Sequence, residues 1–355
     1  MHGREQASGL STATSETAGL ARAAFLERSG LAAARREPLP GDASTRRYWR
    51  LAGKGLLLME DRHDRAGFDG FVQLSAHLMA LGLSAPRVQV TDSAHCLALI
   101  EDFGPHTYAA RLAEGRDEAA LYALAVDALL HLHRHPDALA IDRPRFDLET
   151  WLQGLDTFAR WFAPAIRPGL DVDAFAQRWR ALWAPSLAPL AARRTALVLR
   201  DFHIDNLVEL DGRAGVARCG LLDFQDAALG PAEYDLVSLL QDARRDLAPG
   251  LEAAMLRRYI AGAPADAGDA AAIRARYALA GAQRHARIIG VFTRLAQRDG
   301  KRRYLRFLPR VLCQLDVALG AAGLQHVAGF LDDTLPGWQA HGAALAVSDD
   351  GAVSR

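Results

Sequence analysis

The sequence changes character about one third of the way along the chain. The first hundred residues contain short apolar runs broken by Gly, Pro and Asp, namely GKGLLLMED, APRVQV and CLALIEDFG, which is typical of strands. One helical stretch, FDGFVQLSAHLMALGL, lies among them. Further on, apolar residues recur at helical spacing, as in Leu121, Ala125, Leu129 and Leu132, and only 197–223 is strand-like again. We therefore predict an α+β fold of two lobes, a small β-rich N-terminal lobe and a larger α-helical C-terminal lobe.

The change of pattern also sets the domain boundaries that we expect. Clefts between two lobes are common places for ligands. The expected parts are a disordered tail at 1–19, the N-terminal lobe at 20–104, the C-terminal lobe at 105–325, and a C-terminal segment with a flexible end at 326–355.

Composition excludes several classes of partner. The 355 residues carry 42 basic and 42 acidic side chains, so the net charge is zero and no nucleic acid or anionic membrane is expected as a partner. No apolar run is long enough to span a membrane, and the polar N-terminus lacks the apolar centre of a secretory signal. The three cysteines are far apart in apolar surroundings, as expected for thiols in a reducing compartment. We expect a cytoplasmic protein, and the absence of coiled-coil heptads favours a monomer.

Polar residues flank a hairpin within the second lobe. Asn206 directly precedes the run LVEL (207–210), and Asp223 directly follows the run VARCGLL (216–222). Antiparallel pairing of the two runs brings Asn206 and Asp223 together at the open end of the hairpin. Asp201 lies five residues before Asn206, within reach of the same place. A purely structural alternative is turn chemistry, because Asp and Asn often end strands by bonding to nearby backbone.

These residue types suit the transfer of a phosphoryl group. Two oxygen ligands, together with phosphate oxygens and water, satisfy Mg²⁺, which takes few protein carboxylates. The third carboxylate, Asp201, is then free to accept a proton from an attacking hydroxyl. A base in D-x-x-x-x-N, followed by a metal-binding Asp in a D-F pair, is the arrangement of kinase-type phosphoryl transfer.

The surrounding motifs resemble a known family. LRDFHIDN followed by LLDFQDAALGPAEYDLVSLL resembles the aminoglycoside phosphotransferase branch of the protein-kinase-like superfamily, over about residues 20–325. Together with GDASTRRYWRL, the second motif resembles a narrower group, the anomeric kinases of N-acetylmuramate and N-acetylglucosamine in cell-wall recycling. The resemblance implies that Asp201 is the catalytic base, that Asn206 and Asp223 bind Mg²⁺, and that His203 orders the loop. It implies a structural role for Asp235, for which a helix cap is an equal alternative.

The resemblance also implies that the lobe at 20–104 binds the nucleotide and that the lobe at 105–325 carries catalysis and acceptor binding. The residues that match the phosphate loop of the narrower group are Gly41, Asp42, Ser44, Thr45, Arg46, Arg47 and Tyr48. The lysine usual in the third strand is missing, since Met59 and Glu60 occupy that region, and either Arg46 or Arg47 is our candidate to balance the phosphates. The hinge strand is CLALIEDFG, where backbone groups around Glu101, Asp102 and Phe103 are expected to meet the adenine edge.

We therefore expect an ATP- and Mg²⁺-dependent small-molecule kinase whose acceptor is the anomeric hydroxyl of an N-acetylated amino sugar in peptidoglycan recycling. Two alternatives stay open. One is a kinase of another alcohol, such as an aminoglycoside or a choline-like compound, for which Asp147, Glu149 and Asp156 could form an acidic pocket. The other is a nucleotide-binding protein without catalysis, because the lysine is missing and Leu199 replaces the first His of the family loop.

Overall fold

The computed structural model describes residues 17–40 and 46–347. The chain divides into two compact units, each with its own packing. The first unit is Met1–Arg111 with Leu207–Asp226, and the second is Leu112–Asn206 with Ala227–Arg355. The hairpin region Leu207–Asp226 thus groups with the first hundred residues, although helices flank it in the sequence.

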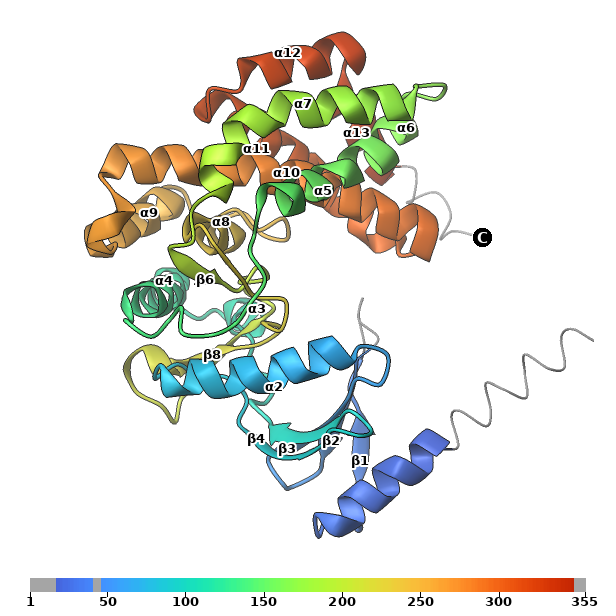
Figure 1. The fold of residues 1–355 in the computed structure, drawn as a ribbon, viewed down its shortest axis with the longest axis vertical. Helices are drawn as coiled ribbons and strands as arrows, with labels where there is room; N and C mark the ends of the chain where they lie inside the picture. Colours follow the sequence, from blue (N-terminus) through green and yellow to red (C-terminus); the bar gives the residue numbers. More distant parts are fainter. Residues whose placement is uncertain (1–16, 41–45, 348–355) are drawn as a thin grey trace, which may run out of the picture. The chain divides into compact units, whose positions relative to one another are not determined.

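A five-stranded antiparallel sheet forms the centre of the first unit (Figure 1). Its strands lie in the order β1-β2-β3-β5-β4. Every neighbouring pair is antiparallel, and the ladder between β4 and β5 shifts register between Val88 and Val90. The strands are β1 (Arg36–Pro38), β2 (Arg47–Leu51), β3 (Leu56–Glu60), β4 (Val88–Asp92) and β5 (Leu97–Glu101).

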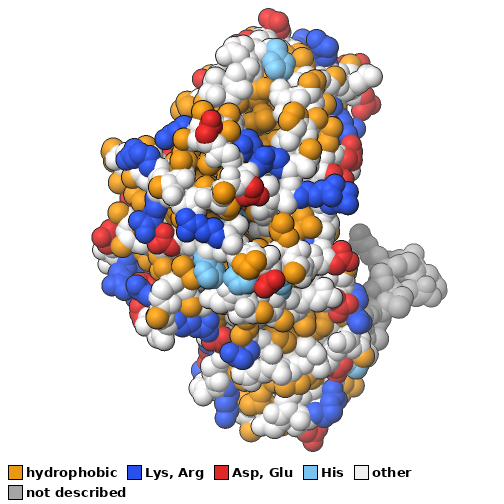
Figure 2. Space-filling model, turned by 60° about the vertical axis from the view of Figure 1, so that its left-hand side comes forward, with side chains coloured by type: hydrophobic (Ala, Val, Ile, Leu, Met, Phe, Trp, Pro, Cys, Tyr) orange, Lys and Arg blue, Asp and Glu red, His pale blue; other side chains and the backbone are white. Residues whose placement is uncertain are grey.

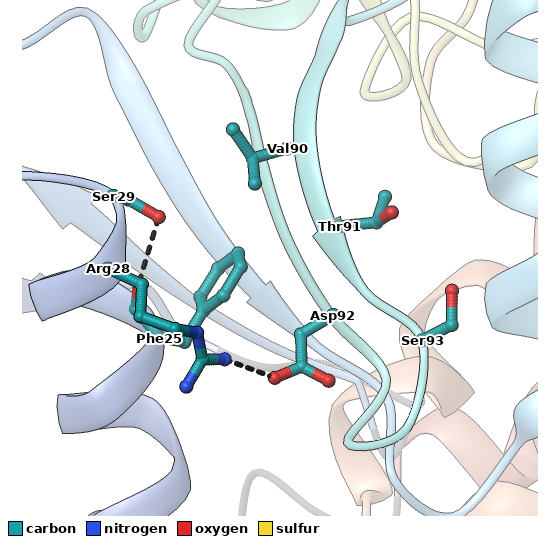
Figure 3. A pocket seen from close by; sticks show the side chains of 7 residues that line it. All are labelled: Phe25, Arg28, Ser29, Val90, Thr91, Asp92 and Ser93. Carbon is teal, nitrogen blue, oxygen red and sulfur yellow. Dashed lines mark hydrogen bonds and ion pairs between the residues drawn. The ribbon is translucent and has the colours of Figure 1, made fainter.

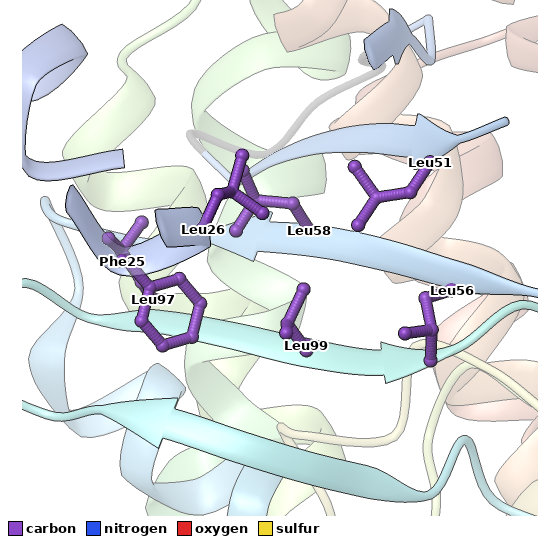
Figure 4. Packing of buried hydrophobic residues seen from close by; sticks show 7 residues of the cluster. All are labelled: Phe25, Leu26, Leu51, Leu56, Leu58, Leu97 and Leu99. Carbon is purple, nitrogen blue, oxygen red and sulfur yellow. The ribbon is translucent and has the colours of Figure 1, made fainter. Parts of the chain in front are cut away.

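Helices cover the two faces of this sheet because strand side chains alternate between them. On one face, Phe25 and Leu26 of the helical residues 17–28 pack against Leu58, Leu97 and Leu99 (Figure 4). On the opposite face lies α2 (Arg65–Ala80), whose N-cap residue is Asp64 (Figure 1).

The hairpin of the first unit is short. Strands β7 (Leu207–Glu209) and β8 (Cys219–Leu221) pair with Leu207 opposite Leu221. The Leu221 N–H donates to the Ser84 carbonyl at 2.7 Å, which ties β8 to the residues after α2. The run 216–222, which we expected to be a strand, begins as a 3₁₀ turn at Gly215–Arg218, because the ladder already ends at Glu209 opposite Cys219. Helix α3 (Tyr108–Ala113) follows the hinge strand.

The second unit is mostly helical. Its described helices are α4 (Glu118–Arg134), α5 (Leu148–Thr157), α6 (Ala163–Ile166), α7 (Val172–Ala191), α8 (Glu233–Leu240), α9 (Leu251–Gly262), α10 (Ala270–Asp299), α11 (Leu308–Ala321), α12 (Gln325–Thr334) and α13 (Trp338–Val347). A π-helical segment, Phe158–Phe162, continues α5, and 3₁₀ turns occur at Ala265–Ala267 and Arg302–Phe307. Two short strands, β6 (Ala196–Val198) and β9 (Ala228–Gly230), pair antiparallel. The predicted α+β class is confirmed.

The long helix α10 organises the core of this unit. It packs against α5, the π-helical segment, α8 and α11. At Gly290 the backbones meet so closely that a Cβ atom would lie 2.1 Å from the carbonyl carbon of Thr157, so only glycine fits there. Trp151 and Phe158, on the segments that face α10, are fully buried.

The surface carries both signs of charge. Acidic and basic side chains are interspersed across the face shown in Figure 2. In the part of the chain that the structure describes, no helix is both long enough and apolar enough to cross a membrane.

Candidate active site

The loop that carries Asp201 belongs to the second unit, and α8 fixes its start. Strand β6 leads into Leu199 and Arg200, and the carboxylate of Asp235 accepts the N–H groups of both, at 2.6 and 2.8 Å. Asp235 is fully buried and lies within α8, whose N-cap residue is Ala232. Its carboxylate therefore holds the loop 35 residues away. Arg200 has a φ of 73°, one of three positive values among the described residues other than glycine.

The loop itself is a compact turn from Asp201 to Asn206. The His203 N–H donates to the Asp201 carbonyl at 3.1 Å, and the Asn206 N–H donates to the His203 carbonyl at 2.8 Å. The side-chain amide of Asn206 also donates to the Asp201 carbonyl, at 3.0 Å. Because the Nδ2 atom of Asn206 is committed to the loop, its Oδ1 atom faces the other way as an acceptor. Asp201 and Asn206 are both partly exposed.

Burial perturbs the two groups that support this loop. Desolvation, aided by the positive charge of Arg244, lowers the pKa of His203 to about 4, so its ring is neutral at pH 7. Its Nε2 atom lies 3.3 Å from Asn206 Nδ2, where a neutral ring nitrogen can accept. Desolvation raises the pKa of Asp235 to about 7, against the two backbone N–H donors, which lower it.

Asp223 belongs to the first unit, two residues after β8. Its φ is 57°, and it is exposed. The side-chain amide of Gln225 donates from Nε2 to Asp223 Oδ1 at 2.9 Å and accepts at Oε1 from Arg46 Nη1 at 2.8 Å. Arg46 in turn donates from Nε to Asp61 Oδ2 at 2.9 Å. A continuous chain of hydrogen bonds thus runs from Asp223 to the residue that follows β3.

Aromatic side chains support this chain of hydrogen bonds. Phe224 stacks on Phe71 of α2 with ring centroids 5.2 Å apart, and the Arg46 guanidinium lies 5.7 Å from the centroid of the same Phe71 ring. Sequence reasoning missed Asp61, Phe71 and Gln225. The positions of Asp61 directly after the third strand and of Gln225 directly after the D-F pair were the available signals.

The two candidate arginines of the nucleotide side occupy different environments. Arg46 is only 6% exposed and is ion-paired with Asp61, which is 1% exposed. Arg47 is exposed at the start of β2, opposite Glu60. Of the other residues assigned to the phosphate loop, Tyr48 lies in β2, whereas Gly41, Asp42, Ser44 and Thr45 lie outside the described residues.

The side chains of the expected hinge have structural partners. Glu101 pairs with Arg213 at 2.5 Å, and the guanidinium of Arg213 lies 5.1 Å from the centroid of the Phe103 ring. Asp102 accepts from Arg50 Nη2 at 3.0 Å and from the Gly104 N–H at 2.8 Å. The side chains of Glu101 and Asp102 therefore both have partners within the first unit.

The donor set fits a magnesium ion. Among the described residues, no group of three or more His, Cys, Asp or Glu side chains could hold a metal. By residue type, the amide oxygen of Asn206 in the second unit and the carboxylate of Asp223 in the first unit are ligands of the kinds that Mg²⁺ accepts together with phosphates and water. Leu207, the neighbour of Asn206 in the chain, pairs with Leu221, which is two residues before Asp223.

One hollow of the first unit lies elsewhere. It measures about 420 Å³ and is lined by Phe25, Arg28 and Ser29 at the end of the first helix and by residues 90–93 of β4 and its end (Figure 3). None of the predicted site residues lines it. Its only guanidinium, from Arg28, is paired with Asp92 at 2.6 Å, so the hollow lacks a free charge for a nucleotide.

The first unit is an antiparallel sheet with a buried Arg–Asp pair. The second unit is helical and carries an Asp–Asn loop that a buried carboxylate holds. This combination indicates a kinase-like phosphotransferase. Residues 35–274 match the phosphotransferase enzyme family, APH. The chain belongs to this family, which confirms the predicted family and the prediction of a small-molecule kinase that uses ATP.

Relatives and solved structures agree with this assignment. The chain is 38% identical over 89% of its length to the N-acetylmuramate/N-acetylglucosamine kinase of Caulobacter vibrioides, of which 96% is covered. It is 31% identical over 79% of its length to the enzyme of the same name from Pseudomonas aeruginosa, of which 83% is covered.

Solved structures confirm the fold. ADP-bound aminoglycoside phosphotransferase APH(2'')-Ib matches with a TM-score of 0.54 at 16% identity, over 81% of this chain and 94% of that one. A choline/ethanolamine kinase family protein from Mesorhizobium loti matches with a TM-score of 0.53 at 16% identity, over 88% of this chain and 92% of that one. The predicted protein-kinase-like fold is therefore confirmed.

Proposed function

We propose that the protein transfers the γ-phosphate of ATP, with Mg²⁺, to the anomeric hydroxyl of N-acetylmuramate or N-acetylglucosamine. The choice of acceptor rests on the 38% identity, over 89% of the chain, to an N-acetylmuramate/N-acetylglucosamine kinase. The observation that supports the chemistry is the Asp201 loop, whose backbone is held by Asp235. We further propose a monomeric, cytoplasmic enzyme of peptidoglycan recycling, in keeping with a net charge of zero.

In the proposed reaction, the carboxylate of Asp201 orients the acceptor hydroxyl and takes its proton. The hydroxyl oxygen forms a bond to the γ-phosphorus, the bond from this phosphorus to the β–γ bridging oxygen breaks, and ADP leaves. Asn206 Oδ1 and the Asp223 carboxylate are the residues that would hold Mg²⁺, which neutralises charge on the phosphate oxygens. His203 and Asp235 act through the loop backbone and keep Asp201 in place.

On the nucleotide side, we propose that Arg46 or Arg47 balances the charge of the phosphates and that Gly41, Asp42, Ser44 and Thr45 belong to the loop that covers them. The adenine edge then meets backbone groups around Glu101, Asp102 and Phe103. The buried Arg46–Asp61 pair supports Arg46 as the fixed cation. An arginine keeps its charge at any working pH, so the missing lysine does not leave the site without one.

The structure gives no support to a pocket for a cationic acceptor built from the three acids of α5 and its cap. Asp147 accepts the Thr150 N–H at 2.9 Å as a helix N-cap. Glu149 and Asp156 both pair with Arg180, at 2.6 and 2.8 Å. All three acids therefore have structural partners, and an uncharged or anionic acceptor is the better candidate.

The test measures phosphate transfer to purified amino sugars. Incubation with ATP, Mg²⁺ and N-acetylmuramate or N-acetylglucosamine should give a sugar 1-phosphate by phosphorus NMR, with loss of the reducing end. Asp201→Asn should abolish this product. Asp205→Asn is the matched control, because Asp205 lies in the same loop but is exposed and paired with Arg244 at 2.9 Å.

Two results would count against the proposal. Transfer to choline or an aminoglycoside, with none to either amino sugar, would reject the acceptor. Stabilisation of the fold by ATP and Mg²⁺ without any turnover would favour the non-catalytic alternative.

A further inference from the structure

We propose that Gln225 is a positioning residue that couples the metal-binding carboxylate of Asp223 to the buried Arg46–Asp61 pair. The inference rests on the proposed function, because it takes Asp223 as a metal ligand. All of the contacts that carry it lie within the first unit. It predicts that the affinity for the magnesium–nucleotide complex depends on an amide that touches neither the metal nor the nucleotide.

The first argument is the chemistry of the amide. Both polar atoms of the Gln225 side-chain amide form hydrogen bonds. Nε2 donates to Asp223 Oδ1 at 2.9 Å, and Oε1 accepts from Arg46 Nη1 at 2.8 Å. Only a side chain with a donor and an acceptor at this length makes both bonds. Glutamate keeps the bond from Arg46 but repels Asp223, and methionine keeps the size but makes neither bond.

The second argument is that the far end of the chain of hydrogen bonds is rigid. Arg46 and Asp61 are 6% and 1% exposed, and the Arg46 Nε atom lies 2.9 Å from Asp61 Oδ2. The ring of Phe71 holds the other side of the Arg46 guanidinium and stacks on Phe224 at 5.2 Å. Gln225 is thus anchored to β3 and to α2.

The third argument is that Asp223 needs such an anchor. Its side chain is exposed, and its backbone has a left-handed φ of 57°. With Oδ1 held by Gln225 at 2.9 Å, rotation of the carboxylate is restricted. Partners of this kind orient metal ligands before the metal binds, which lowers the entropy lost on binding.

The experiment compares nucleotide binding with and without magnesium by isothermal titration calorimetry, using a non-hydrolysable ATP analogue. Gln225→Met should weaken binding of the magnesium complex about tenfold, in the range seen when outer partners of metal ligands are lost. Binding of the metal-free analogue in EDTA should change less than about twofold, because the effect acts through Asp223. Asp61→Asn should act in the same direction, and the double variant should be less affected than the product of the two single effects.

Kinetics give a second readout. The magnesium concentration at half-maximal rate should rise about tenfold in Gln225→Met, whereas kcat at saturating magnesium and the KM for the sugar should stay within about threefold. Gln225→Leu, which also makes neither bond, should show the same shift and serves if Gln225→Met folds poorly. Gln153→Met is the control, since Gln153 is exposed and bonds only to Glu149 at 3.1 Å.

The outcomes separate this inference from the proposed function. A wild-type protein that does not bind the magnesium complex overturns both. A wild-type protein that binds it, with Gln225 variants of unchanged magnesium dependence, overturns the inference alone. Equal weakening with and without magnesium, together with a lower melting temperature, also overturns it, because that pattern indicates a merely structural role.

Discussion

Lowering the pH from 7 to 5 should destabilise the folded protein, because three histidines are buried in their neutral form. Burial lowers the pKa of His133 and His203 to about 4 and that of His285 to about 3. In the unfolded chain the same side chains titrate near pH 6.5. Stability from these groups is present above pH 6.5 and is lost as the pH falls toward the folded values.

Two buried carboxylates act in the opposite direction, because burial raises the pKa of Asp61 as well as that of Asp235. Burial raises the pKa of Asp235 from 3.8 to about 7. The folded protein therefore binds a proton between about pH 4 and 7 that the unfolded chain does not bind. Stability from Asp235 is present below pH 4 and is lost as the pH rises through 7.

The net effect follows from the protons bound in each state. Near pH 5.3, the unfolded chain holds nearly three more protons on the histidines, and the folded chain holds about one more on Asp235. The net uptake on unfolding is about two protons, so the free energy of unfolding should fall by about 2 to 3 kcal/mol per pH unit. Carboxylates with lowered pKa, such as Asp147, titrate mainly below this window.

Urea unfolding at pH values between 5 and 7 measures this slope directly. Asp235→Asn removes the opposing proton, so the uptake near pH 5.3 should rise to about three. His285→Gln should lower the uptake by about one. A free energy of unfolding that is flat between pH 6 and 5 would refute the reasoning, as would an Asp235→Asn slope equal to that of the wild type.

Three further predictions concern the site and the core. Asp201→Asn should lower kcat by a factor of about 10³ with the KM for ATP nearly unchanged, and Asp205→Asn should keep wild-type rates, both in a coupled ADP assay. Asp223→Ala should remove the magnesium-dependent part of nucleotide affinity in calorimetry, leaving the affinity in EDTA. Gly290→Ala should destabilise the protein by about 3 kcal/mol in urea unfolding, because the new Cβ atom meets the Thr157 carbonyl carbon at 2.1 Å; a change below about 1 kcal/mol would contradict this.

The fold was predictable because its signals are local. The runs GKGLLLMED and CLALIEDFG contain β3 and β5, APRVQV contains the first three residues of β4, and FDGFVQLSAHLMALGL contains most of α2. Alternating and helical spacings are set by the backbone geometry of a few neighbouring residues. The length of β8 was not predictable in this way, since a 3₁₀ turn at Gly215–Arg218 replaces its first residues.

The partners of the site residues were less predictable because they lie far apart in the sequence. Arg46 and Arg47 are adjacent residues of the same type, so the sequence does not distinguish them. In the structure, Arg46 is buried against Asp61 and Arg47 is exposed. The sequence could not decide whether Asp235 has a structural role or caps a helix, because its partners, Leu199 and Arg200, are 36 and 35 residues away. Tertiary contacts of this separation leave no periodic trace in the sequence.

In the proposed site, where an arginine supplies the charge of the lysine that β3 lacks, Arg46 would bring a hydrogen-bond network as well as a charge. An ammonium group is a compact point charge, whereas a guanidinium presents donors in a fixed plane. Arg46 uses this plane to donate to Asp61 from Nε and to Gln225 from Nη1 while its face lies over Phe71. A lysine here would keep the charge but lose this simultaneous geometry. The arginine therefore joins β3, α2 and Gln225 into one rigid group, and through Gln225 it reaches the carboxylate of Asp223.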